Sequence, residues 1–266
     1  MNLERFRRLE INGGRVITEP VLSLRLPVVQ QGYADAQIDD YGVKQSGGWR
    51  SRGRGRYPWR PGLELNIRAR FSHPAGLLVG TTGFGFWNAP FGDPTVRWPS
   101  LPQAVWFFYG SAPTDLPLAP DGPGRGWFVA TLDAATAAAK ALALTTPVVL
   151  LLNQWPAVRR RLWPAIQRRL GIRYAPLEAN MMEWHHYRLR WQRNGCAFFM
   201  DGSLILETPF RPQGPLGFVC WLDNQYMIAT PRGRFRWGML PVPEPQWMEV
   251  AELQIAAYPG LGRSHR

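Results

Sequence analysis

The sequence predicts an all-β sandwich or barrel. Its 266 residues are 45% hydrophobic and include 13 tryptophans, enough to bury a substantial core in one large domain. The 27 glycines and 25 prolines, with few stretches of helical periodicity, favour short strands joined by turns. Alternation of apolar and polar residues marks individual strands, and turn dipeptides separate them.

The first half of the chain contains several of these strands. Residues from Arg15 to Val29 predict one or two opening strands, and Tyr33 to Asp40 predicts another. Between Leu63 and Phe71, apolar residues at odd positions alternate with polar residues at even positions, as in a strand with one buried face. Gly83 to Asn88 is a further apolar strand segment.

Residues 184–202 carry the clearest strand pattern. Three apolar residues alternate with two arginines before the turn dipeptide Asn194-Gly195, and the next apolar run ends at Asp201-Gly202. This pattern predicts two successive hairpins.

Between these halves the strand pattern is interrupted, and residues 130–172 predict a helical insertion. The alanine-rich segment from Asp133 to Leu144 predicts a helix capped by Asp133. A second helical region begins at Thr146-Pro147 and continues to Gly171, bent by Pro156 and Pro164.

The second helical region is basic and amphipathic. Val158, Leu162, Ile166 and Leu170 recur every four residues, while three arginines lie elsewhere on the helical wheel. Three roles are compatible with this pattern. The helix can pack on the outer sheet with its arginines in water, close over a concave face as a lid, or lie at a membrane surface through residues 146–172.

The strand segments resemble those of a known family in sequence and order. Besides the segments given above, they include Pro215 to Asn224 and Trp247 to Ile255. The pattern resembles the family 16 glycoside hydrolases, such as laminarinases and lichenases, over residues 33–109 and 184–256. The resemblance implies a concanavalin A-like antiparallel β-sandwich, or jelly roll. Residues 1–266 would then form one sandwich domain with an α-helical insertion.

The catalytic residues of that family are absent where the resemblance places them. In the family, a Trp-Pro such as Trp98-Pro99 leads into a Glu-x-Asp-x-x-Glu strand. Read without gaps, Gln103, Val105 and Phe108 occupy the three acidic positions, and residues 97–114 contain no Asp or Glu. Neither a carboxamide nor a phenyl ring can act as nucleophile or proton donor, so this alignment excludes ordinary retaining hydrolysis.

The altered strand instead predicts an apolar concave cleft. The expected ligand-binding residues are Gln103, Val105, Trp106, Phe108 and Tyr109, together with Trp87 and Trp221. The ligand expected for such a cleft is a hydrophobic or aromatic small molecule, whose rearrangement or cyclisation the cleft could promote by shaping it. Whether turnover occurs is left open by the sequence.

Two alternatives remain for the cleft. The chain can be a carbohydrate-binding module, or an atypical carbohydrate-active hydrolase with displaced carboxylates such as Glu183 or Asp223. His186 and Tyr109 are further weak candidates for catalysis. His185 and His186 are adjacent and therefore point to opposite faces of a strand, so we expect no metal pair, and the sequence indicates no cofactor.

The formal net charge of +12 also suggests an anionic partner. The segment from Trp49 to Arg60 alternates arginines with Ser and Gly before Tyr57 and Trp59, which is a possible nucleic-acid site. No recognised nucleic-acid motif accompanies it, so we expect a solvated loop.

The remaining features favour a cytoplasmic protein. The start has no signal-peptide pattern, and Val148 to Leu152 is the longest aliphatic run, too short to span a bilayer. Cys196 and Cys220 are too few for a disulfide scaffold, so reduced thiols are expected. The sequence does not specify the oligomeric state.

Overall fold

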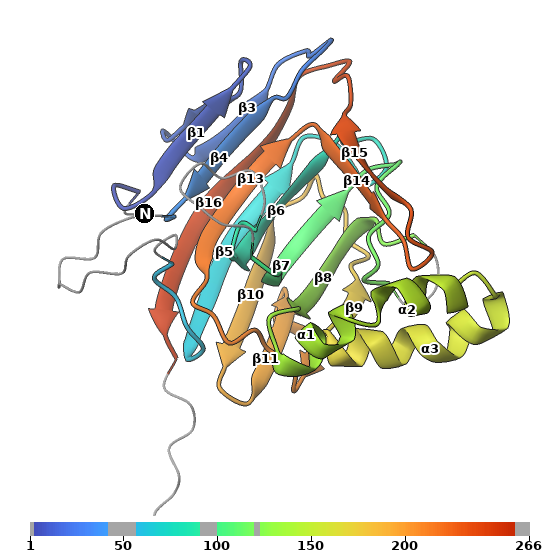
Figure 1. The fold of residues 1–266 in the computed structure, drawn as a ribbon. Helices are drawn as coiled ribbons and strands as arrows, with labels where there is room; N and C mark the ends of the chain where they lie inside the picture. The colour runs from blue at the N-terminus through green and yellow to red at the C-terminus, as the bar shows by residue number, and fades with distance from the viewer. Residues whose placement is uncertain (1–2, 42–56, 91–99, 120–122, 259–266) are drawn as a thin grey trace, which may run out of the picture.

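Two antiparallel sheets packed face to face make up most of the structure (Figure 1). The computed structural model describes residues 3–41, 57–90, 100–119 and 123–258. Every strand pair within the two sheets is antiparallel. This arrangement confirms the predicted concanavalin A-like antiparallel β-sandwich with an α-helical insertion.

Each sheet contains seven strands. Sheet A has the order β1 (Arg7–Ile11), β4 (Asp35–Asp39), β13 (Gly217–Asp223), β6 (Thr81–Trp87), β7 (Gln103–Gly110), β8 (Gly126–Asp133) and β9 (Arg173–Pro176). Sheet B has the order β12 (Ser203–Thr208), β11 (Gly195–Met200), β10 (His185–Gln192), β5 (Leu63–Phe71), β16 (Gln246–Ala257), β3 (Leu22–Leu26) and β2 (Arg15–Ile17). A separate hairpin follows β13 and consists of β14 (Gln225–Ala229) and β15 (Phe235–Met239).

The two predicted hairpins are strands β10, β11 and β12. The second turn is Asp201-Gly202, with φ values of 50° and 82° that suit Asp and Gly in a tight hairpin. The first turn lies one residue earlier than predicted, at Arg193-Asn194, because Gln192 pairs with Gly195. Gly195 is needed in the strand itself, since a Cβ there would lie 2.3 Å from the carbonyl oxygen of Thr208.

The main core lies between the sheets. It is built from every second residue of the strands, the residues that point inward. Large contributions come from Phe84, Phe107, Trp127, Tyr187 and Trp191. Several of these rings meet edge to face, for example Phe107 and Tyr187 with centroids 5.2 Å apart. Aromatic packing therefore joins β7 of sheet A to β10 of sheet B.

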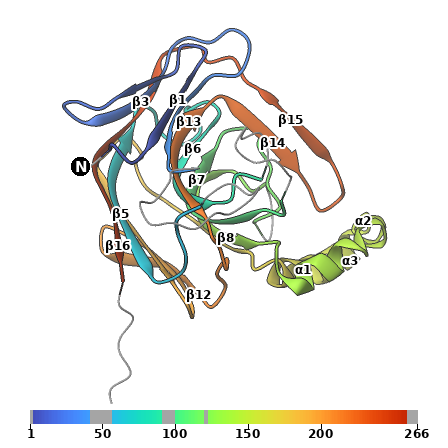
Figure 2. The same cartoon turned by 60° about the vertical axis from the view of Figure 1, so that its left-hand side comes forward.

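Three helices lie between β8 and β9 and form a helical arm that projects from the edge of the sandwich in both views (Figures 1 and 2). They are α1 (Ala137–Ala143), α2 (Thr146–Leu152) and α3 (Pro156–Arg169). The cap of α1 is Thr136, whose hydroxyl accepts from Ala139 N–H at 3.1 Å. The predicted cap was wrong because Asp133 ends β8 and its carboxylate accepts from Gln103.

The predicted second helical region is divided in two. Pro156 begins α3 instead of bending a continuous helix, because proline fits the first turn of a helix, where its N–H is not needed. The apolar stripe is buried only toward the end of α3, at Ile166, and none of the seven residues of α2 is buried. Packing along the whole length of the helix on an outer sheet is therefore not observed.

Among the helices of the described residues, none has both the length and the apolar character that a bilayer-spanning segment requires.

The aromatic junction between the sheets can be tested by truncating one ring. Phe107→Ala is expected to lower the free energy of unfolding by about 3 to 5 kcal/mol, because Phe107 is fully buried and contacts several rings. Phe235→Ala is the matched control, since Phe235 is 68% exposed and its loss should change stability by less than about 0.5 kcal/mol. Chemical denaturation measures both, and equal effects would contradict the assigned core.

Candidate functional site

Strand β7 separates two hydrophobic environments. All eight of its residues are buried. Val105, Phe107 and Tyr109 belong to the core between the sheets, whereas Ala104, Trp106 and Phe108 belong to a second apolar cluster on the opposite, open face of sheet A. Sheet A is therefore covered by apolar side chains on both faces.

This alternation corrects the placement of two predicted cleft residues. Val105 and Tyr109 lie in the core and cannot line the open face together with Trp106 and Phe108. The Tyr109 hydroxyl donates to the carbonyl oxygen of Leu78 at 2.9 Å and accepts from Gly76 N–H at 2.9 Å, which are structural roles. Tyr109 is thus not placed for catalysis in the cleft.

Gln103 also differs from its predicted position. Its side-chain amide donates to Asp133 Oδ1 at 2.8 Å across the β7–β8 pair. Strand β7 pairs with β6 and β8 without a bulge, so Gln103 and Val105 share one face while Phe108 lies on the other. The three aligned positions therefore do not meet on one face, and the open face of β7 contains no ionisable group.

Six rings form a continuous surface on the open face, called here the aromatic floor. These rings are Trp87, Trp106, Phe108, Phe128, Tyr174 and Trp221. Their neighbouring centroids lie 4.8 to 5.9 Å apart, with Trp106 and Phe108 at the centre. The three predicted ligand-binding tryptophans, Trp87, Trp106 and Trp221, are thereby brought together from β6, β7 and β13.

Two glycines of β6 make room for the central indoles. A Cβ at Gly83 would lie 2.9 Å from the Trp221 ring, and a Cβ at Gly85 would lie 2.7 Å from Trp106 Cβ. The same strand places Phe84 and Phe86 in the core on its other face. The Gly-Phe-Gly-Phe sequence thus supplies bulk to the core while leaving the open face of β6 flat for rings from its neighbours.

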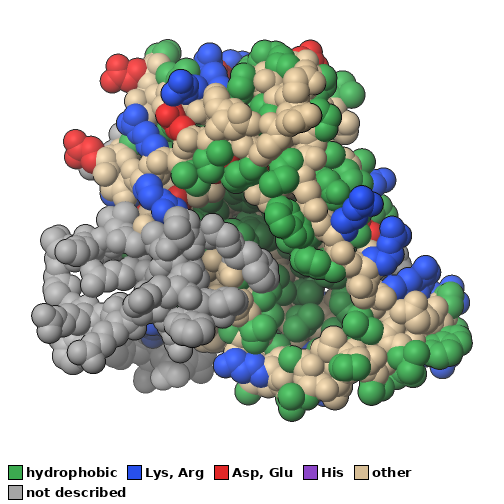
Figure 3. Space-filling view, turned by 45° about the horizontal axis from the view of Figure 1, so that its top comes forward, with side chains coloured by type: hydrophobic (Ala, Val, Ile, Leu, Met, Phe, Trp, Pro, Cys, Tyr) green, Lys and Arg blue, Asp and Glu red, His purple; other side chains and the backbone are tan. Residues whose placement is uncertain are grey.

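The open face is hollowed, and hydrophobic side chains lie at the bottom of the hollow (Figure 3). Trp106, Phe108 and Trp221 each keep 7 to 8% of their surface accessible, while Trp87 and Tyr174 are half-buried. Rings at the bottom of a hollow expose such small areas. A ligand entering it would meet ring faces first.

The polar groups of the aromatic floor differ in how well they are paired. Trp221 Nε1 donates to Thr81 Oγ1 at 2.9 Å, and Trp87 Nε1 donates to the Tyr41 hydroxyl. Within the described part of the chain, Trp106 Nε1 and the Thr114 hydroxyl are buried without a hydrogen-bond partner. Leaving a buried donor unpaired costs about 1 to 3 kcal/mol, so these two groups point to a missing partner.

Thr114 lies near Phe108, one of the two central rings of the floor. A Cβ built on Gly110 would lie 2.9 Å from Thr114 Cγ2 and 3.2 Å from Phe108 Cε1. The Phe108 and Trp106 ring centroids are 5.2 Å apart. The Trp106 ring and the Thr114 side chain therefore both lie near Phe108.

Carboxyl groups occur on the open face, but beyond Trp221 and away from β7. Asp223 of β13 lies directly opposite Asp35 of β4, and opposite residues in an antiparallel pair have Cβ atoms about 4.5 to 5.5 Å apart. Burial raises the pKa of Asp35 well above its ordinary value, and the neighbouring Asp223 raises it further. Burial raises the pKa of Asp223 to about 6.

A hydrogen-bond chain joins this carboxyl pair to the aromatic floor. The Thr81 hydroxyl donates to Asp223 Oδ1 at 2.8 Å and accepts from Trp221 Nε1. Asp35 is only 1% exposed, so the pair is enclosed and does not present two carboxylates to a bound sugar. Asp223 is thus connected to the floor but is not arranged with Asp35 as an open hydrolytic pair.

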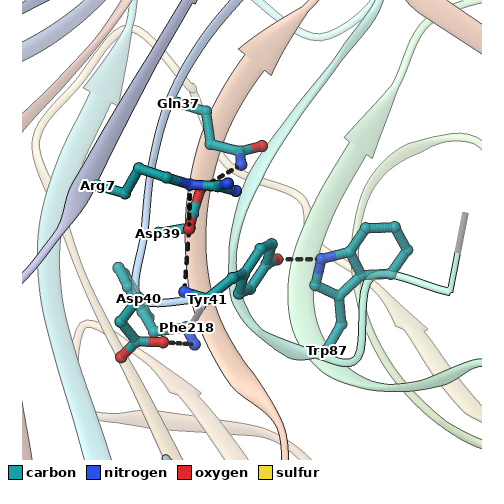
Figure 4. A network of polar contacts seen from close by, with 7 residues as sticks. All are labelled: Arg7, Gln37, Asp39, Asp40, Tyr41, Trp87 and Phe218. Atoms are coloured by element: carbon teal, nitrogen blue, oxygen red, sulfur yellow. Dashed lines mark hydrogen bonds and ion pairs between the residues drawn. The ribbon is translucent and has the colours of Figure 1, made fainter. Parts of the chain in front are cut away.

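Asp39 and Asp40 anchor the end of β4 (Figure 4). Arg7 forms an ion pair with Asp39 at 2.9 Å, and Tyr41 N–H donates to the same carboxylate at 3.0 Å. Asp40 accepts from Phe218 N–H at 2.7 Å and from the Trp59 indole at 2.5 Å. Burial raises the pKa of Asp40 to about 7. These contacts hold Tyr41 where its hydroxyl receives the Trp87 N–H at the edge of the floor.

The other sequence candidates lie elsewhere. His186 is exposed on the outer face of sheet B, where it pairs with Arg68, and Glu183 accepts from the side-chain amide of Asn180. His185 contacts Asp201 at 2.6 Å and the carbonyl oxygen of Asn180 at 3.0 Å. Residues 49–56 of the predicted nucleic-acid segment from Trp49 to Arg60 lie outside the described residues, as does the dipeptide Trp98-Pro99. No three His, Cys, Asp or Glu side chains in the described ranges come together to hold a metal ion.

Sequence reasoning missed four groups of this site, namely Asp35, Thr114, Phe128 and Tyr174. Phe128 and Asp35 belong to strands whose alternation could have been read, because Trp127 and Val129 point to the core on either side of Phe128. Tyr174 and Thr114 follow irregular segments, and their proximity to Phe128 and Phe108 depends on the tertiary fold.

Comparison with known proteins finds similarity among solved structures. No protein-family model and no curated protein matches the sequence. Similar solved structures include a laminarinase from Flavobacterium sp. UMI-01, with 12% identity, 97% of this chain and 95% of that chain covered, and a TM-score of 0.49. A β-glucanase from Bacillus licheniformis gives 10% identity, coverages of 93% and 90%, and a TM-score of 0.45. The catalytic domain of an endo-1,3-β-glucanase from Thermotoga petrophila gives 11% identity, coverages of 92% of this chain and 79% of that chain, and a TM-score of 0.43. At such low identities the likeness concerns fold alone, and the fold assignment rests on the strand order described above.

The raised pKa of Asp223 predicts a pH dependence of stability. Because the folded state holds this proton more tightly than the unfolded state, the stabilising contribution of Asp223 is fully present below about pH 4 and is lost as the pH rises through about 6. Asp223→Asn keeps an oxygen that accepts from the Thr81 hydroxyl but cannot ionise. Between about pH 4 and about pH 7 the free energy of unfolding of this variant should therefore fall by roughly 2 to 3 kcal/mol less than that of the wild type. Unfolding free energies of both proteins across this range measure the difference.

Asp201→Asn is a control of opposite sign, because the pKa of Asp201 is lowered through its contacts with His186 N–H and His185, which outweigh burial. Its loss should destabilise the protein more at neutral pH than in acid. Parallel pH profiles for wild type and Asp223→Asn would contradict the assigned environment of Asp223.

Proposed function

We propose that this chain is a non-hydrolytic binding protein for a hydrophobic or aromatic small molecule, which it holds on the aromatic floor. The observation that carries the proposal is the open face of β7. On the open face this strand presents Ala104, Trp106 and Phe108, flanked by Trp87 and Trp221. Stacking on ring faces is what such a surface offers a ligand.

The unpaired polar groups restrict the class of ligand further. Trp106 Nε1 can only donate, and the Thr114 hydroxyl can donate or accept. A ring system that carries one oxygen acceptor, such as a carbonyl, would satisfy the indole N–H and bury its apolar body on the floor. The proposed ligand class is therefore a flat apolar molecule with an oxygen acceptor at one end.

A sugar is the second candidate, because indole rings also stack on sugar faces. The observation favouring it is the Asp35–Asp223 pair, which Thr81 connects to Trp221. The pair is enclosed, however, and Trp221 and Trp87 have already used their indole N–H groups within the protein. A polyol needs many hydrogen-bond partners, so the floor suits an apolar ring better.

A rearrangement or cyclisation of the bound molecule remains part of the proposal. The floor can act by restricting the shape of a ligand, and no ionisable side chain projects from β7 on this face. A cytoplasmic location is likewise proposed, in keeping with Cys196 and Cys220, which are both free and buried.

Ring stacking on the floor can be tested with Nile red, a neutral apolar fluorescent probe. Trp106→Leu and Phe108→Leu keep apolar bulk but remove ring faces, so each should weaken probe affinity by about tenfold. Trp155→Leu is the matched control, because Trp155 is 54% exposed on the arm and should leave the affinity unchanged. Displacement of the probe by an oligosaccharide would favour the sugar alternative, and absence of any uptake would overturn the proposal.

The acceptor preference can be tested with a pair of naphthalenes of similar size, 2-acetonaphthone and 2-ethylnaphthalene. Wild type should bind the ketone about 3- to 10-fold more tightly, because only the ketone accepts a hydrogen bond. Thr114→Val is isosteric and Trp106→Phe keeps a ring, so each should reduce this preference. Equal binding of both compounds by the wild type would contradict the proposed preference for an oxygen acceptor, but not the proposed stacking of the ligand on the aromatic floor.

A further inference from the structure

We propose that the helical arm and the hairpin β14–β15 together form a docking surface for an anionic lipid bilayer. The sequence already raised interfacial binding for residues 146–172. The structure adds a second element, the hairpin, which begins more than fifty residues later in the chain and meets the arm in space (Figure 1).

Specific contacts join the two elements. Asn153, which follows α2, donates through its side-chain amide to the carbonyl oxygen of Pro231 at 2.9 Å. Gln154 donates in the same way to Arg232 at 3.0 Å. A Cβ built on Gly233 would lie 3.2 Å from Leu150, so the hairpin turn rests directly against α2. These contacts hold the end of α2 against the hairpin turn.

This docking surface exposes an unusual set of large apolar side chains. They are Leu144, Val148, Leu151, Leu152, Trp155 and Val158 of the arm, and Phe235, Trp237 and Met239 of the hairpin. Trp155 and Trp237 are 54% and 58% exposed, and Phe235 is 68% exposed. Exposed apolar groups gathered in this way mark an interaction site, whereas scattered single residues do not.

The same segments carry ten of the 31 basic residues of the protein and no acidic residue. Residues 134–177 contain seven basic residues and residues 224–243 contain three, and neither segment contains an Asp or Glu. Ten positive charges thus lie in two touching segments of a chain whose formal net charge is +12. Arg160, Arg161, Arg234 and Arg236 are all exposed there.

Apolar and basic groups are mixed within the docking surface rather than separated. A groove of about 780 Å³ along the arm is lined by Leu152, Val158 and Leu162 together with Arg160 and Arg161. An acyl chain could contact the apolar walls while the guanidinium groups bind the phosphate of a headgroup. Trp and Phe beside arginine are typical of helices and loops that lie at a bilayer interface.

Charge and composition together favour a bilayer over other occupants. A second copy of the chain would bring ten like charges to the same surface and be repelled. Nucleic acid would satisfy the arginines but leave the aliphatic side chains of α2 exposed to water. An anionic bilayer provides both a negative surface and an apolar layer beneath it.

The proposal can be tested by flotation of the full chain with vesicles of phosphatidylcholine alone and of phosphatidylcholine mixed with phosphatidylserine. Binding is expected to the mixed vesicles and to weaken with added salt, because salt screens the arginine–headgroup attraction. Two double variants, Arg160→Gln with Arg161→Gln and Phe235→Ser with Trp237→Ser, should each reduce binding by about tenfold. The four substituted side chains are all exposed to solvent, so these variants should fold as the wild type does.

Matched variants elsewhere provide the controls. Arg8→Gln with Arg193→Gln removes the same charge from exposed positions outside the docking surface, and Leu77→Ser with Leu204→Ser removes exposed apolar groups. Both should bind vesicles as wild type does. Equal losses in the control and docking-surface variants would overturn the proposal, as would no flotation with phosphatidylserine vesicles. The bilayer proposal would also be overturned if the wild type self-associated and the double variant Phe235→Ser with Trp237→Ser did not. That result would identify a second copy of the chain as the occupant of the docking surface.

Discussion

Sheet A is covered by apolar side chains on both faces, and the rest of the structure depends on this constraint. One face completes the core of the sandwich through Val105, Phe107 and Tyr109, while the other bears the aromatic floor around Trp106 and Phe108. A strand buried on both faces has little place for charge, because an unpaired ion in such an environment is costly. The absence of carboxylates on the open face of β7 is therefore tied to how this sheet is packed.

The polar groups of the open face are arranged around that constraint. The acids lie beyond Trp221, where Asp223 receives the Thr81 hydroxyl and Asp39 is paired with Arg7. Their burial raises the pKa values of Asp35, Asp40 and Asp223, so these groups resist ionisation. On the floor itself, the unpaired Trp106 indole is the donor most in need of a partner within the described residues. Shape and one or two hydrogen bonds, rather than charge, would select a ligand there.

The helical arm and the hairpin connect this apolar site to the outside of the molecule. Both elements leave sheet A near the hollow, the arm between β8 and β9 and the hairpin after β13. Their exposed tryptophans and arginines form the proposed docking surface. The two proposals rest on different residues and are compatible with each other.

The sequence by itself determined the all-β class, the position of the helices between two sets of strands, and the loss of acidic residues from β7, because these follow from alternation, turn residues and composition. Only the tertiary structure decided which side chains share a face across strands. Strand pairing placed Val105 and Tyr109 in the core, brought Asp35 opposite Asp223, and set Phe128 against Phe108. It also put the hairpin turn against α2, since Gly233 and Leu150 are distant in sequence and their contact requires the folded chain. Local patterns specify each strand and its alternation, whereas neighbours across strands are set by packing between segments far apart in the chain.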